Sequence, residues 1–188
     1  MMTNCLKATI YIVLTFSATN VFAQQYVSEP NFWSTPTIQG YGKIHMFPHA
    51  EFRPNKSETY NIVFSITKGV EKPDKVNTSL DHVARTLNLY VAAGVPLSHL
   101  HFVAIAYGDA TPLAISNSAY NKRYGTDNPN LKLIYLLSRA GVKVAVCGQA
   151  VAEHKFSYED VDKSVLTALS GLTTVTTLEH QGYDLMPL

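Results

Sequence analysis

The chain has 188 residues, of which 46% are hydrophobic and 15% are charged, and its formal net charge at pH 7 is +1. This balance, without any run of basic residues, argues against a nucleic-acid-binding protein. After residue 23, no apolar stretch approaches the ~20 residues that a membrane-spanning helix needs. We therefore expect a single domain that binds neither nucleic acid nor membrane.

The first 23 residues are typical of a secretory signal peptide. Lys7 supplies the positive charge, residues 8–16 form the apolar run, and Val21-Phe22-Ala23 is a small-residue cleavage site. Cleavage would leave 165 residues with 14 basic and 14 acidic side chains. It would also remove Cys5, so that Cys147 would be the only cysteine and no internal disulfide would form. We expect a periplasmic or secreted protein.

Residues 24–58 are predicted to form an irregular arm. The segment is rich in proline, glycine and aromatic residues, and it shows neither a helical nor a strand period. Disordered segments contain few aromatic residues, so we expect the arm to pack on the domain that follows. Its His45 and His49 are interpreted as solvated loop residues, because no helix fixes their spacing for a metal ion.

Residues 59–188 are predicted to form one α/β domain. Runs of β-branched and aromatic residues predict strands that end near Thr67, Tyr107 and Cys147, with two more at 165–169 and 183–186. Spacing and capping residues predict helices at 78–93, 111–120, 129–140, 149–153 and 172–181, and a short one from 157. This alternation predicts a three-layer fold, with a mostly parallel five-stranded sheet and helices on both faces.

Three predicted strands should bring their carboxyl ends to one edge of the sheet, where ligands of such folds bind. The residues at these ends are Lys68-Gly69, Gly108-Asp109 and Cys147-Gly148. If a helix begins after Gly148, the sulfur of Cys147 lies beside free backbone N–H groups, which favour the thiolate. The alternative is that Cys147 is a small buried apolar residue at the end of a strand.

Several short motifs resemble the DsrE/DsrF-like family. They are Tyr107-Gly108-Asp109-Ala110, Asn128-Pro129-Asn130, Gly141-Val142, Cys147-Gly148-Gln149-Ala150 and Gln181-Gly182-Tyr183. The likeness runs from about Thr35 to the end, and Gly40-Tyr41-Gly42 in the arm resembles an element of the exported members. The resemblance implies a five-stranded α/β fold assembled as homotrimers or hexamers. It also implies that Cys147 accepts sulfane sulfur as a persulfide, although many relatives have His where this chain has Tyr107.

Two functional hypotheses follow. In the first, the protein is an exported sulfur carrier or sulfurtransferase-like protein, in which the Cys147 thiolate attacks a sulfur donor. Besides Cys147, the residues expected to bind the anion or the substrate are Gly148, Gln149, Ala150, Tyr107, Gly108, Asp109 and Lys68. In the second, the protein is a non-catalytic oligomeric protein that binds a small ligand or a metal, with Cys147 packed or acting as a metal ligand. Neither hypothesis includes a cofactor.

Overall fold

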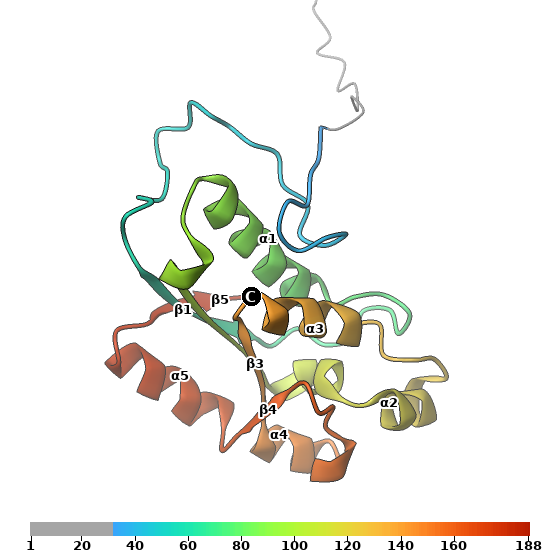
Figure 1. The fold of residues 1–188 in the computed structure, drawn as a ribbon. Helices are drawn as coiled ribbons and strands as arrows, with labels where there is room; N and C mark the ends of the chain where they lie inside the picture. Colours follow the sequence, from blue (N-terminus) through green and yellow to red (C-terminus); the bar gives the residue numbers. More distant parts are fainter. Residues whose placement is uncertain (1–31) are drawn as a thin grey trace, which may run out of the picture. The chain divides into compact units, whose positions relative to one another are not determined.

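Five parallel strands form the centre of the structure (Figure 1). The computed structural model describes residues 32–188, so the predicted signal peptide lies outside the described residues. The strands are β1 (Tyr60–Ile66), β2 (Leu100–Ala106), β3 (Lys143–Cys147), β4 (Leu166–Ala168) and β5 (Asp184–Pro187). They follow the order β4-β3-β2-β1-β5, and every neighbouring pair is parallel. The predicted fold class is confirmed, and β5 takes the edge position expected of it.

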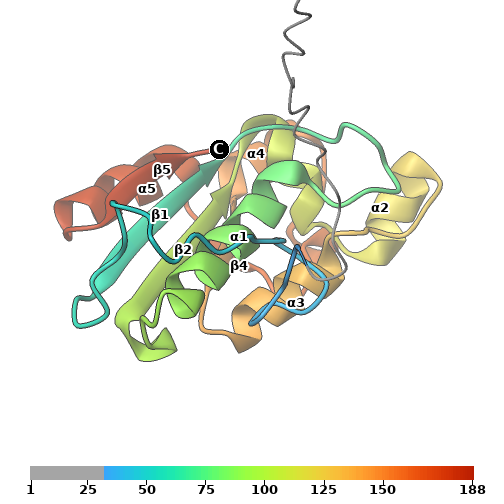
Figure 2. The same ribbon diagram turned by 90° about the horizontal axis from the view of Figure 1, so that it is seen from above.

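Helices cover both faces of this sheet. On one face, α1 (Thr78–Ala92) and α3 (Leu131–Arg139) pack over the main hydrophobic core. On the other face, α5 (Gly171–His180) packs against β1 and β2 and closes a smaller core (Figure 2). The second face is therefore covered by one helix, which leaves the β4 side of that face less protected than the β1 side.

Side chains of alternate strand residues enter the two cores, as the pleat of a strand requires. Phe64 and Phe102 lie in the main core, with their ring centroids 5.3 Å apart. Val63 and Val103, one residue away along each strand, lie in the smaller core beside α5. Replacing fully buried Phe64 by alanine should destabilise the fold by about 3–5 kcal/mol, because the cavity would not close completely.

The ends of α1 and α5 agree with the predicted caps. The side chain of Asn77 accepts a hydrogen bond from the backbone N–H of Leu80 at 3.1 Å and so caps α1. The hydroxyl of Ser170 accepts one from the N–H of Leu172 at 3.2 Å and caps α5. The helix predicted for the threonine-rich segment 172–181 is therefore confirmed, although threonine favours strands by propensity.

The segment after β2 differs from its prediction. Instead of one helix from residue 111 to 120, it forms a 3-10 helix, η2 (Gly108–Ala114), and then α2 (Asn117–Tyr124). The hydroxyl of Thr111 donates to the carbonyl of Gly108 at 2.7 Å and does not cap a following helix. An isolated antiparallel bridge between Ile115 and Val161 separates the two helices. The expected loop from residue 121 is consequently helical as far as Tyr124.

The remaining elements are short. After β3 comes α4 (Gly148–Glu153), and the helix expected from residue 157 is a single 3-10 turn, η3 (Tyr158–Asp160). Another 3-10 turn, η1 (Leu97–His99), precedes β2. None of the helices within residues 32–188 combines the length and the hydropathy that crossing a bilayer requires.

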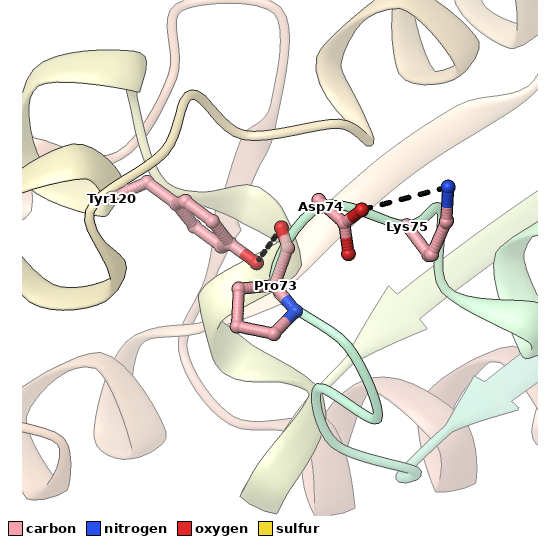
Figure 3. A network of polar contacts seen from close by, with 4 residues as sticks. All are labelled: Pro73, Asp74, Lys75 and Tyr120. Carbon is pink, nitrogen blue, oxygen red and sulfur yellow. Dashed lines mark hydrogen bonds and ion pairs between the residues drawn. The ribbon is translucent and has the colours of Figure 1, made fainter.

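The loop between β1 and α1 is tied to α2. The hydroxyl of Tyr120 donates to the carbonyl of Pro73 at 3.1 Å, and Asp74 pairs with the neighbouring Lys75 at 3.5 Å (Figure 3). Both members of this ion pair are exposed, so the pair adds little stability. Burial of Tyr120, followed by the effects of Tyr124 and Asp74, raises the pKa of its phenol to about 12. The neutral phenol is therefore the form that holds the loop.

The arm, described from residue 32 to 58, packs on α1 through the buried side chain of Asn88. The amide oxygen of Asn88 accepts from the backbone N–H groups of Thr37 (3.1 Å) and Ile38 (2.8 Å). Its amide nitrogen donates to the carbonyls of Tyr41 (3.0 Å) and Gly42 (2.9 Å). One side chain thus satisfies four backbone groups of a segment that has no regular secondary structure of its own.

Candidate functional site

Cys147 is the last residue of β3 and the N-cap of α4. Its Sγ accepts a hydrogen bond from the backbone N–H of Ala150 at 3.3 Å. Extended backbone at Cys147, with φ −68° and ψ 117°, leads directly into the helix that begins at Gly148. The first-turn N–H groups of a helix have no partner within it, so a sulfur at this position is surrounded by donors.

The sulfur is nevertheless covered, because Cys147 exposes only 5% of its surface. Cys147 pairs with Ala168 of β4. On its other side, the last register pair of β2 and β3 is Ala106 with Val146, so the next residue of each strand places Tyr107 beside Cys147. These neighbours share the face of the sheet on which α5 lies. A thiol in this setting must be uncovered before another molecule can reach it.

Tyr107 is held between the sheet and the start of α5. Its hydroxyl and the hydroxyl of Ser65 on β1 lie 2.7 Å apart and share a hydrogen bond. Its ring lies against Gly171, where an added Cβ would be 2.6 Å from the Cγ of the ring. Since β1 and β3 lie on opposite sides of β2, the hydroxyl is directed away from Cys147. Tyr107 therefore fixes the first turn of α5. Its hydroxyl does not take the place of the histidine that many relatives have beside the thiol.

A hollow of about 380 Å³ lies next to the turn that follows Cys147. It is lined by Gly148, Gln149, Tyr158, Thr167, Ala168 and Leu169, but not by Cys147 itself. The amide nitrogen of Gln149 donates to the carbonyl of Leu169 at 3.2 Å, which joins α4 to the end of β4. A Cβ at Gly148 would lie 3.0 Å from the carbonyl oxygen of Ala168, so glycine permits this close approach.

The sequence predicted Gly148 and Gln149 at this edge, but it did not reveal Tyr158 or Leu169. Leu169 reaches the hollow because β4 pairs with β3, and Tyr158 reaches it because η3 contacts α4. The only signal for this pairing in the sequence is the predicted strand at 165–169, which does not specify a neighbour.

Lys68, Gly108 and Asp109 form a second group at the same edge. Gly69 packs on Asp109, since a Cβ at Gly69 would lie 3.0 Å from the Cβ of Asp109. The carbonyl of Lys68 accepts from the side chain of Asn77 at 2.8 Å, while its own side chain is exposed. Within residues 32–188, no hydrogen bond or ion pair joins this group to Cys147. The structure thus brings the β1 and β2 ends together and leaves the thiol in a separate group.

For a metal ion, the described part of the chain offers no cluster of ligands. No three His, Cys, Asp or Glu side chains within residues 32–188 lie close enough together to hold one. In that range, the free thiol of Cys147 is the only cysteine.

Comparison with known proteins identifies the family. The model of the DsrE/DsrF-like family matches residues 61–188, and no curated protein matches. Among solved structures, the protein of unknown function MTH1491 from Methanobacterium thermoautotrophicum is 16% identical with a TM-score of 0.50, over 69% of this chain and 99% of that chain. The ychN protein from E. coli is 14% identical with a TM-score of 0.49, over 69% of this chain and 100% of that chain. By its match to the family model, this chain belongs to the DsrE/DsrF-like family.

Proposed function

We propose that this protein is a sulfur carrier in which Cys147 holds a sulfane sulfur as a persulfide. The observation that carries the proposal is the position of the thiol, at the end of β3 and at the N-cap of α4, with the N–H of Ala150 3.3 Å from its sulfur. Hydrogen bonds to ionised acceptors are stronger than those to neutral ones, so this donor favours an anionic sulfur. Membership of the DsrE/DsrF-like family suggests a sulfur-relay type of fold and supports the same conclusion.

The chemistry consists of two exchanges without net oxidation. The Cys147 thiolate attacks the outer sulfur of a donor persulfide, R–S–SH, and forms a new S–S bond while that of the donor breaks. The donor leaves as the thiolate R–S⁻ with the electron pair of the broken bond. An acceptor thiolate then attacks the outer sulfur on Cys147, which leaves as a thiolate in its turn.

The other candidate residues receive different roles in this proposal. The backbone N–H groups of Gly148, Gln149 and Ala150 stabilise the anion, and the hollow beside Gly148 is the place from which the donor approaches. Tyr107 packs on Gly171 and so positions the first turn of α5. Within residues 32–188, no hydrogen bond or ion pair joins Lys68, Gly108 or Asp109 to Cys147, so the proposal assigns them no role in binding the donor.

We also propose that the protein is exported and that it forms homo-oligomers, either trimers or hexamers. The support for export is the sequence of residues 1–23. The support for oligomers is a set of exposed leucines around β4 and the start of α5, namely Leu166, Leu169 and Leu172. The most exposed of the three, Leu169, exposes 76% of its surface. Clusters of exposed apolar side chains commonly mark interfaces between proteins.

Intact mass spectrometry after treatment with inorganic polysulfide tests the carrier proposal. The wild-type chain should gain the mass of one or more sulfur atoms, and dithiothreitol should reverse the gain. In protein that begins at Gln24 and so lacks Cys5, Cys147→Ser should gain none, and it should keep its fold because serine is also a good N-cap residue. A wild-type protein that takes up no sulfur, while a small thiol in the same solution does, would refute the proposal.

A further inference from the structure

The arm and the end of α1 enclose an apolar groove of about 540 Å³. We call it the arm groove, and its principal walls are Met46, Phe47, Phe52 and Arg53 of the arm, with Leu89 and Tyr90 of α1. Pockets that bind small molecules typically measure about 300–1,000 Å³ and are lined mainly by apolar and aromatic side chains. The arm groove has both properties, and it shares no residue with the hollow beside Cys147.

Two aromatic side chains of the arm groove are strongly exposed to water. Phe52 exposes 94% of its surface and Phe47 exposes 68%. Large aromatic side chains on short loops are usually covered, because removing their surface from water is favourable. A ligand that lies between these rings and α1 would supply this cover.

Two aromatic walls of the arm groove, Phe47 and Tyr90, are held in place by neighbouring rings. The ring of His45 stacks on Phe32 at 3.9 Å, shares a 2.8 Å hydrogen bond with the carbonyl of Phe32, and meets the edge of Phe47 at 4.9 Å. On the α1 side, the ring of Tyr90 lies 4.6 Å from that of Tyr60. A preformed site loses little conformational entropy when a ligand binds, which leaves more of the contact energy for affinity.

Arg53 places a positive charge at the rim of this apolar surface. One nitrogen of its guanidinium donates to the carbonyl of Pro48 at 2.7 Å. Among the described residues, the only ion pair joins Lys75 to Asp74, so neither Arg53 nor the nearby Glu51 is paired. The other nitrogens of the guanidinium therefore remain available to an anionic group, for which arginine has a suitable planar geometry.

We propose that the arm groove binds a small organic anion with an aromatic body. The aromatic body lies against Phe47, Phe52 and Leu89, and its carboxylate or sulfonate faces Arg53. Binding of this anion does not involve Cys147. The arm would thus bind a ligand in addition to covering α1.

A pair of fluorescent dyes with the same aromatic body tests the proposal. Anilinonaphthalene sulfonate carries an anionic group, whereas phenylnaphthylamine is neutral. We expect saturable binding of both dyes, with the sulfonate bound more tightly. Arg53→Gln should weaken binding of the sulfonate about two- to fivefold, as expected for an exposed charge pair, and should leave binding of the neutral dye unchanged.

Two further variants locate the site. Phe52→Ser should weaken binding of both dyes about five- to tenfold, because apolar contact is lost. Tyr135→Ser is the matched control, since it removes another exposed aromatic side chain, on α3, that does not line the groove. Circular dichroism should be the same for all three variants. The proposal is overturned if neither dye binds saturably, if Arg53→Gln affects both dyes equally, or if Phe52→Ser and Tyr135→Ser have the same effect.

Discussion

Gly171→Ala most directly tests how Tyr107, which lies beside Cys147 in the sheet, packs on the start of α5. The new Cβ would lie 2.6 Å from Cγ, 2.7 Å from Cδ1 and 2.9 Å from Cβ of Tyr107. These distances are too short for carbon atoms, and the ring cannot turn away freely because its hydroxyl is bonded to Ser65. Overpacking of this kind destabilises proteins by about 1–3 kcal/mol.

The clash is partly offset by an effect on the unfolded chain. Gly171 is not among the glycines with a positive φ, so alanine fits its backbone. Replacing glycine by alanine at such a position stabilises a protein by about 0.4–1 kcal/mol. We therefore expect a net loss of about 1–2 kcal/mol in the free energy of unfolding, measured in urea.

A second background separates the two effects. In a Tyr107→Gly protein both the ring and its Cβ are absent, so Gly171→Ala should stabilise the fold by about 0.4–1 kcal/mol. The same substitution thus changes sign between the two backgrounds. In the wild-type background it should also increase the rate at which iodoacetamide labels Cys147, because Tyr107 or α5 must shift. If Gly171→Ala stabilises both backgrounds, the ring does not press on α5 and the close packing of Tyr107 on Gly171 is wrong.

Three other substitutions have defined outcomes. Asn88→Ala removes four hydrogen bonds to the arm, so the free energy of unfolding should fall by about 2–5 kcal/mol. Trypsin should also cut the arm faster, and an unchanged cleavage rate would contradict this attachment. The pKa of Tyr120 is raised to about 12, so stability should fall as the pH rises from about 10 to 12, and this part of the loss should be absent in Tyr120→Phe. Leu172→Glu should convert the oligomer to monomers in sedimentation velocity, whereas wild-type protein that is already monomeric would refute the proposed assembly.

Much of the fold could be predicted from local patterns. The strands that end at Ile66, Ala106 and Cys147 are continuous apolar runs, and a strand that is buried on both faces requires such a run. Caps such as Asn77 and Ser170 act on groups within three residues, so the sequence contains both partners. The helix expected at 111–120 failed because the bridge between residues 115 and 161 depends on a segment far along the chain.

The site was less predictable for the same reason. The arrival of three strand ends at one edge follows from the parallel order, and it was expected. The direction of the Tyr107 hydroxyl depends on Ser65, and one strand beside Cys147 is β4, whose Ala168 lies more than twenty residues later. The arm groove depends on Asn88, whose four bonds to the arm span about fifty residues of sequence. Side-chain contacts over such separations leave no periodic pattern in a single sequence.

In the proposed carrier reaction, the position of β4 offers a route by which sulfur would reach the covered thiol. This strand has three residues, lies at the edge of the sheet and pairs only with β3. Short edge elements with exposed side chains open at lower free energy than the central strands do. Cys147 pairs directly with Ala168 at the end of this strand, and the hollow beside Gly148 borders the same junction. Separation of β4 would therefore uncover the sulfur from the side of the hollow, while the three central strands stay paired.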